Sequence, residues 1–450
     1  MPAEKITGKE KHAVLAHSKD SLLQRFVRGV SWNIVGTVFA QGSVFAANIL
    51  IANQLGPHSF GEFSLLQNTA LTLSAIAQVA AGATATRYVA QYRTSDPARA
   101  GRILGFCALL TLMTGLIGCV LLFSLSGWLS VETLKAPQLA DGLKVMAVYL
   151  MVSAMSGYQT GALAGLEGYR RIAWLGAMHA IVHIVVVAAG VWFYGLPGAL
   201  WALVVSLVAR WWIFHQGIKE ETKQFGIRIT YGMEKDERSV LLRFALPSAL
   251  GGLTAMPALW LANTFLVQHP DGFRQLGLYS AAFSLKAAVM LLPIAVNGVG
   301  GAIMNSYMAP KDHSLYRHAY WSNVVATTCV AFLAALFVII FGEFLLNFFG
   351  REFLSAHAAL IILMVCTVPE ALAISLYQVI QTREKMWWSL IAVSIPRDCL
   401  IVIAAYFLVG ERGATGLSVA YLLGWLVALT AISVKAYRIG IKTTNFSNLT

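Results

Sequence analysis

The sequence has few charged residues and few groups that could hold a polar ligand. Only 12% of its 450 residues are charged, whereas 58% are hydrophobic, and the mean hydropathy is +0.67. Soluble domains carry roughly 25% charged residues, so this composition excludes a soluble fold. The chain is predicted to be an all-α polytopic membrane protein.

Motifs for cofactors and catalysis are also missing. The five cysteines all fall in apolar runs, which argues against a disulfide framework or a zinc site. No phosphate-binding glycine loop, nucleotide motif or serine-histidine set is present, so neither an enzyme nor a cofactor is expected and transport energy should come from an ion gradient. The longest external connection, Trp128 to Lys144, is short, which disfavours a membrane polymerase or ligase.

The hydrophobic residues gather in runs of about 20, the length that crosses a bilayer as a helix. The first run begins near Val30 and continues at spanning length, so no cleavable signal is predicted. Twelve spans are expected, at 30–53, 60–86, 103–127, 145–166, 172–194, 197–217, 241–267, 276–307, 319–345, 358–381, 388–409 and 414–435.

The basic residues alternate sharply between the two sides of this arrangement. Of the 33 lysines and arginines, 25 fall in connections on the side of the termini, five fall on the other side, and three (Arg210, Lys286 and Arg397) lie within spans. By the positive-inside rule both termini are cytoplasmic. The net charge of +12 is dispersed through short loops, so it predicts topology and no nucleic-acid partner.

An internal repeat is predicted at an offset of roughly 215 to 218 residues. Ala47-Asn48 matches Ala262-Asn263, and Phe63-Ser64 matches Tyr279-Ser280. Two six-helix lobes related by a pseudo-two-fold axis along the membrane normal are therefore expected. The predicted division is a cytoplasmic or interfacial leader at 1–29, the first lobe at 30–218, a cytoplasmic linker at 219–240, the second lobe at 241–435 and a cytoplasmic tail at 436–450.

Four charged residues of the second half are predicted to share one depth. Counted from the outer ends of their spans, Lys286, Glu370, Arg397 and Asp398 lie roughly 15 to 18 Å deep, near the midplane. Charge at this depth is costly and is usually functional, although structural pairing or snorkelling of Lys286 is the alternative. A polar cavity is predicted in which one acid neutralises a base and the other is free to take up a proton.

Other polar residues and the prolines supply further candidates. His179 and His183 have the four-residue spacing of a metal pair, but no third ligand joins them, so a cavity-facing pair or simple buried hydrogen bonding is expected. Five arginines cluster at cytoplasmic span ends: Arg25, Arg28, Arg87, Arg210 and Arg243. Most of them are expected to set topology and one or two to meet an anionic substrate, with Arg28 and Arg87 as the candidates. Prolines inside second-half spans are predicted hinges, with static kinks as the alternative: Pro247, Pro257, Pro293, Pro369 and Pro396.

The first two spans carry a family resemblance. Arg28-Gly-Val-Ser-Trp-Asn33, Ala47-Asn-Ile-Leu50 and Leu55-Gly-Pro-His-Ser-Phe-Gly-Glu-Phe63 resemble the start of the bacterial oligosaccharide flippases, the Wzx-type branch of the multidrug/oligosaccharidyl-lipid/polysaccharide superfamily. Gly165-Leu-Glu-Gly-Tyr-Arg-Arg171 is similar to a later loop of that family. The resemblance implies two lobes around a central cavity, alternating access, and a place in the bacterial inner membrane.

The implied substrate is a polyprenyl-diphosphate-linked oligosaccharide, moved from the cytoplasmic to the periplasmic leaflet for surface polysaccharide such as O-antigen, capsule or exopolysaccharide. On this reading Lys286 and Arg397 contact the diphosphate or sugar acids, and Glu370 or Asp398 couples movement to protons or sodium. Membrane lipids and polysaccharide-assembly proteins such as a polymerase are the implied partners. A related MATE-type exporter of drugs or metabolites is the main alternative.

Overall fold

The computed structural model describes residues 8–78, 81–231, 255–308, 313–382 and 386–444, and these residues form helices joined by short connections. The first half contains α1 (Gly8–Ala77), α2 (Ala81–Tyr92), α3 (Pro97–Trp128), α4 (Ala140–Gly165) and α5 (Tyr169–Gln224). The second half contains α8 (Ala255–Val267), α9 (Gly272–Met308), α10 (His313–Ile340), α11 (Gly342–Asn347), α12 (His357–Thr382), α13 (Met386–Ser389) and α14 (Ile395–Thr444). Two short π-helices, Leu129–Thr133 and Leu390–Ser394, and two short 3-10 helices, Pro137–Leu139 and Arg351–Ala356, complete the described elements.

Eight described segments are long and apolar enough to cross a membrane. They are Gly36–Ala77, Pro97–Thr133, Pro137–Gly165, Tyr169–Gln224, Gly272–Gly301, Leu315–Ile340, Arg351–Gln378 and Leu390–Tyr437. Only helices can satisfy every backbone polar group inside lipid without closing a barrel, and large apolar side chains such as Trp192 and Phe193 are more than 70% exposed on their outer faces. The prediction of an all-α membrane protein is confirmed.

Three of these segments turn back at a glycine. The backbone leaves the helical range at Gly56 (φ 72°) in α1, Gly195 (φ 58°) in α5 and Gly413 (φ 51°) in α14. Positive φ is open to glycine at no steric cost, and Pro57 also disfavours a helical conformation at Gly56. Each of these helices therefore has two arms. The turn between the arms lies where two consecutive predicted spans meet. The count of twelve crossings stays a prediction, because part of span 241–267 lies outside the described residues.

The turns in α5 and α14 repeat one local geometry. Gly195 (φ 58°, ψ −136°) and Gly413 (φ 51°, ψ −128°) stand at the predicted repeat offset and have nearly the same conformation. Three residues later, a Cβ on Gly198 would lie 1.9 Å from the Gly190 carbonyl oxygen, and one on Gly416 would lie 2.3 Å from that of Leu408. Both pairs of arms therefore pack backbone to backbone just past the turn, which supports an internal repeat.

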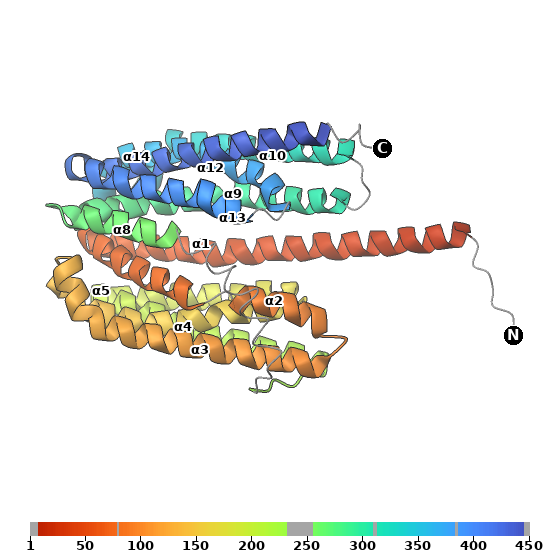
Figure 1. The fold of residues 1–450 in the computed structure, drawn as a ribbon. Coiled ribbons are helices and arrows are strands. Elements are labelled where there is room, and N and C mark those ends of the chain that lie inside the picture. The colour runs from red at the N-terminus through yellow and green to blue at the C-terminus, as the bar shows by residue number, and fades with distance from the viewer. Residues whose placement is uncertain (1–7, 79–80, 232–254, 309–312, 383–385, 445–450) are drawn as a thin grey trace.

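The first arm of α1 separates the two halves in the view of Figure 1. Helices α2 to α5 gather on one side of it and α8 to α14 on the other, and α1 contacts both α5 and α9. The start of α1 and the end of α14 lie at the same end of the molecule (Figure 1). We call the opposite end, which carries the turns at Gly56, Gly195 and Gly413, the outer end, because the charge pattern predicts that it is periplasmic.

The first arm of α1 runs without interruption from Gly8 to the kink at Gly56, so the described part of the predicted leader is continuous with the first predicted span. No proline falls in this stretch, and its leucine and phenylalanine spacing suits a helix that simply continues into the apolar run.

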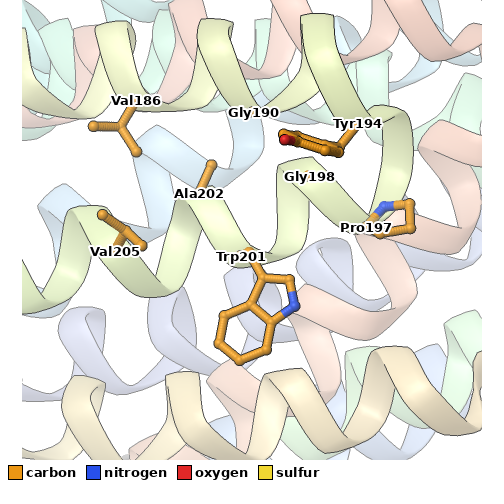
Figure 2. Close-up of a pocket in the computed structure, with 8 residues that line it drawn as sticks. All are labelled: Val186, Gly190, Tyr194, Pro197, Gly198, Trp201, Ala202 and Val205. Atoms are coloured by element: carbon orange, nitrogen blue, oxygen red, sulfur yellow. The ribbon is translucent and has the colours of Figure 1, made fainter.

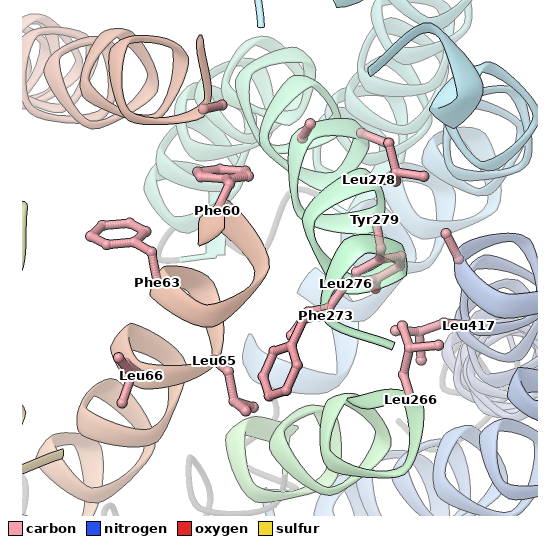
Figure 3. Close-up of a cluster of buried hydrophobic side chains, with 14 of the residues drawn as sticks. Phe60, Phe63, Leu65, Leu66, Leu266, Phe273, Leu276, Leu278, Tyr279 and Leu417 are labelled. Carbon is pink, nitrogen blue, oxygen red and sulfur yellow. The ribbon is translucent and has the colours of Figure 1, made fainter. Parts of the chain in front are cut away.

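The hydrophobic core is shared at the outer end and divided at the other. The largest buried cluster joins the halves, since it contains Phe60, Leu65 and Leu66 of α1 together with residues of α8, α9 and α14, and Leu65 lies beside Phe273 of α9 (Figure 3). Two smaller clusters lie toward the inner end. One, around Leu104 and Ile218, contains first-half residues, and the other contains second-half residues from Met304 to Ile432. Among the described residues, the shared core thus extends from the outer end to about mid-depth, where Trp260 of α8 donates to the Thr69 hydroxyl of α1 at 2.8 Å, and the clusters toward the inner end are separate.

Polar and backbone contacts reinforce the outer seam, the contact between the second arm of α1 and the start of α9. A Cβ on Gly61 would lie 1.8 Å from the Phe273 carbonyl oxygen, and one on Gly277 would lie 1.9 Å from that of Pro57. Nearby, the Gln268 side chain donates to the Thr133 carbonyl oxygen at 2.7 Å. Such close approach of two helices is possible only because glycine lacks a side chain.

Candidate functional site

Lys286 lies in a buried charged cluster that joins three helices of the second half. Its ammonium group pairs with Glu370 of α12 and donates to the Tyr421 hydroxyl of α14 at 2.9 Å. That hydroxyl also lies 3.3 Å from a Glu370 carboxylate oxygen, and Lys286 and Glu370 are 3% and 7% exposed. The rings of Phe283 and Tyr421 stand 5.2 and 4.6 Å from the ammonium nitrogen, so its charge is compensated on several sides.

Arg397 and Asp398 form a second pair on α14. The Arg397 Nε donates to Asp398 Oδ1 at 2.8 Å, and the guanidinium lies 4.8 Å above the Trp425 ring. The other carboxylate oxygen, Asp398 Oδ2, is buried and has no hydrogen-bond partner. A buried acceptor without a partner is costly, so this oxygen is a reasonable place for a proton or a small cation.

Both acids contact a base in the structure, and the expectation that one of them is free to take up a proton stays a prediction. Glu370 pairs with Lys286, and Asp398 pairs with Arg397. Neighbouring residues on a helix project about 100° apart, but the long arginine side chain is able to reach back to the adjacent carboxylate. Removing either partner would leave an isolated buried charge, which explains why these four residues occur together. Their roles toward substrate or ions stay predictions.

His179 and His183 meet at one serine inside the first half. Both belong to the first arm of α5, and Ser206 of the second arm lies 3.1 Å from His179 Nε2 and 2.9 Å from His183 Nδ1. The hydroxyl thus ties the two arms together below the turn at Gly195. Among the described residues, no third His, Cys, Asp or Glu completes a metal-ligating group here.

Arg210 stands next to this pair and was not among the predicted site residues. It follows Ser206 by four positions, so the two side chains share a face of the second arm of α5. The guanidinium donates to the Thr160 hydroxyl of α4 at 3.1 Å and lies 4.4 Å from the Phe214 ring centroid. The sequence did signal it, as one of three basic residues inside spans, but its position near a span end favoured a topological role.

The remaining predicted residues are more scattered. Arg87 of α2 is exposed and lies 5.7 Å from the Tyr88 ring, whereas the side chain of Arg28 and all of Pro247 lie outside the described residues. Pro257, Pro293 and Pro369 stand inside described helices, and Pro396 is the second residue of α14, which follows the π turn Leu390–Ser394. A π turn accommodates the backbone group that a proline leaves unpaired. Hinge roles for these prolines stay predictions.

An apolar groove lies between the two arms of α5 (Figure 2). It encloses about 410 Å³ and is lined by Val186, Gly190, Tyr194, Pro197, Gly198, Trp201, Ala202 and Val205. Gly190 and Gly198, on opposite arms, bring the two backbones into close contact beside the groove. Tyr194 and Trp201 are more than half exposed, so the groove opens on the outer surface of the helix pair, where lipid surrounds a membrane-spanning helix.

A family model described as polysaccharide biosynthesis protein matches residues 26–304, which is more than half of the chain. The chain belongs to the polysaccharide biosynthesis protein family. This family member is 25% identical over 385 residues to the EPS I polysaccharide export inner membrane protein EpsE of Ralstonia nicotianae, with 82% of this chain and 84% of that one covered. The corresponding EpsE protein of Ralstonia solanacearum is 23% identical over the same shares.

Solved structures of MATE and MOP superfamily transporters share the fold of this family member. An inward-facing multidrug resistance MATE family transporter of the MOP superfamily superposes with a TM-score of 0.72 at 16% identity, covering 92% of this chain and 99% of that one. A MOP superfamily transporter from Pyrococcus furiosus, described by the reverse polarity of its binding pocket, gives 0.68 at 17% identity over 93% and 95%. The fold is thus that of this transporter superfamily.

Proposed function

We propose that this protein is a flippase of the bacterial inner membrane that moves a polyprenyl-diphosphate-linked oligosaccharide from the cytoplasmic to the periplasmic leaflet. The observation that carries the proposal is the division of the core. The halves share one buried cluster at the outer end and have separate clusters toward the inner end. A transporter arranged in this way opens toward the cytoplasm, where lipid-linked oligosaccharides are assembled.

A lipid-linked substrate suits both the exposed apolar faces of the protein and the division between its two halves. The prenyl chain would stay in the bilayer beside exposed apolar faces, while the glycan and diphosphate pass between the halves. The transporter fold and the relatives described as polysaccharide export proteins support this reading and a non-enzymatic role. Both termini would lie in the cytoplasm, and polysaccharide-assembly proteins such as a polymerase would take over the product.

The second-half charges suit coupling better than substrate contact. Lys286 is buried and paired with Glu370, so a contact between Lys286 and a diphosphate would first require this pair to separate. Asp398, with one oxygen unpartnered, is the better candidate to exchange a proton or sodium ion during the cycle. Release of Arg397 from Asp398 would then accompany the change between inward-open and outward-open states.

Deletion of the gene tests the proposal. The expected result is loss of surface polysaccharide together with accumulation of the complete lipid-linked unit on the cytoplasmic side, because synthesis continues while translocation stops. Unchanged surface polysaccharide, or loss of the lipid-linked unit itself, would contradict a flippase.

A drug or metabolite exporter is the second candidate, because the similar solved structures include multidrug transporters. It predicts normal surface polysaccharide in the deletion strain and increased sensitivity to cationic drugs. Measuring both phenotypes in one strain separates the two functions.

A further inference from the structure

Buried charge is distributed unequally between the two halves. Among the described second-half residues, the two basic side chains at this depth are each matched by an acid, Lys286 by Glu370 and Arg397 by Asp398. The corresponding interior of the first half has Arg210. In the described part of the chain no acidic side chain pairs with it, and its polar contact is the Thr160 hydroxyl. The two described second-half pairs are thus neutral, whereas the charge of Arg210 has no acidic partner among the described residues.

An unpaired guanidinium at membrane depth needs a counter-charge. A charged side chain costs about 3 kcal/mol at the bilayer centre on insertion scales and less toward an interface; Arg210 lies on the inner side of the centre, and the Phe214 ring beside it offsets part of the cost. Arginine also presents a planar fork of donors that matches phosphate oxygens and holds them by two parallel hydrogen bonds. The missing partner is therefore expected to be an anion supplied from outside the chain.

The polar contact of Arg210 on α4 is a hydroxyl group rather than an acid. Thr160 bonds it directly, and Tyr149, Ser153 and Ser156 share the same face of α4 at earlier turns. His179 lies near enough to Arg210 for the two side chains to interact electrostatically, and its Nε2 contacts Ser206 one turn before Arg210. Hydroxyl and imidazole groups can donate to anionic oxygens without adding negative charge.

We propose that Arg210, with Thr160 and His179, forms the site that receives the diphosphate of the lipid-linked substrate, and that Lys286 does not. The inference rests on the proposed function for the identity of the ligand. The site lies between α4 and the second arm of α5, where no acid of the described residues pairs with Arg210. Arg210 supplies the charge, Thr160 holds the guanidinium from α4, and His179 contributes a further donor from the first arm of α5.

Binding of farnesyl diphosphate to the full-length protein in phosphatidylcholine nanodiscs tests the site, with farnesol as the uncharged comparison. Arg210→Gln is expected to weaken farnesyl diphosphate binding by about 10- to 100-fold, the usual value of a charge-assisted hydrogen-bonded pair. Arg210→Lys should be intermediate, because a lysine keeps the charge but loses the fork. Farnesol binding should not change. Arg412→Gln, the same substitution at an exposed outer-end arginine, is the matched control and should bind as wild type does.

The neutral double variant Lys286→Met/Glu370→Gln gives the opposite test. It removes the second-half pair without leaving an isolated charge, and it should retain farnesyl diphosphate binding within twofold. Loss of binding in this variant together with wild-type binding in Arg210→Gln would overturn the proposal. So would equal weakening of farnesol and farnesyl diphosphate by Arg210→Gln, because a general structural defect would then explain both.

Two further measurements separate the site from its context. Phosphatidylglycerol added to the nanodiscs should not displace farnesyl diphosphate; full competition would assign Arg210 to anionic phospholipid headgroups and overturn the substrate site. Binding of diphosphate could depend on Arg210 while deletion of the gene leaves surface polysaccharide intact. That pair of results would refute the flippase function and keep the anion site. A polysaccharide defect on deletion with Arg210-independent binding would refute only the site.

Discussion

Substitution of Gly277 should shift the protein from the inward-open toward the outward-open state. A Cβ at Gly277 would lie 1.9 Å from the Pro57 carbonyl oxygen and 3.1 Å from the Gly61 nitrogen. Because the closer atom belongs to the backbone, no side-chain rotation relieves the clash, and α1 and α9 must move apart by roughly an ångström or more. Overpacking of this kind costs about 1 to 3 kcal/mol, which changes the ratio of the two states by roughly 5- to 150-fold.

Spin labels on either side of the outer seam measure this shift. Glu132 and His269 are exposed and adjoin the hydrogen bond between Gln268 and Thr133, so cysteines at these two positions report the opening of the outer end. The distance between the two labels is measured by pulsed electron paramagnetic resonance in a background without native cysteines. Gly277→Ala should increase the fraction of molecules in which this distance is long.

A matched glycine on the same helix provides the control. Nothing lies within 4 Å of a Cβ placed on Gly298 of α9, so Gly298→Ala should leave the distance distribution unchanged. If Gly277→Ala gave the wild-type distribution while the protein stayed folded, the outer seam would not limit opening and the reasoning from the glycine contact would be wrong.

Three further predictions concern buried charge and the glycine turns. Lys286→Met should destabilise the protein by about 3 to 5 kcal/mol, because it isolates the buried carboxylate of Glu370, and the added substitution Glu370→Gln should restore much of the thermal stability in detergent; equal instability of both variants would contradict this. Asp398→Asn should abolish the dependence of transport on a proton or sodium gradient in proteoliposomes, whereas an unchanged dependence would exclude Asp398 as the coupling group. Gly195→Ala and Gly413→Ala should each cost about 1 to 3 kcal/mol, because their backbone conformation is nearly restricted to glycine, and wild-type melting temperatures for both would disprove strain at the turns.

The sequence predicted the helical fold well because the signals involved are local. Apolar runs of spanning length, basic loops and the Gly56-Pro57 pair each act through neighbouring residues, since lipid forces every such run to satisfy its own backbone groups. The common depth of Lys286 and Glu370 could be worked out for the same reason, because a helix rises by a constant amount per residue.

Sequence reasoning could not decide which of these groups meet. Whether an acid at a given depth pairs with a base depends on helix rotation and on which helices are neighbours, and both follow from packing between distant segments. Thus the pairing of Lys286 with Glu370 and of Arg397 with Asp398 was missed, as was the backbone contact of Gly61 with α9. Arg210 resembled a topology signal until the structure placed the Thr160 hydroxyl of α4, and no acid of the described ranges, beside it.

By itself, then, the sequence determined that this protein lies in a membrane, that its apolar runs are long enough to span it, and that charge is buried in its second half. Only the tertiary structure decided that helices turn back at Gly56, Gly195 and Gly413, that the second-half charges pair with one another, and that Arg210 has no acidic partner among the described residues. The physical reason is that hydrophobicity and the length of an apolar run are properties of consecutive residues. Charge compensation, by contrast, depends on distances between residues far apart in the chain.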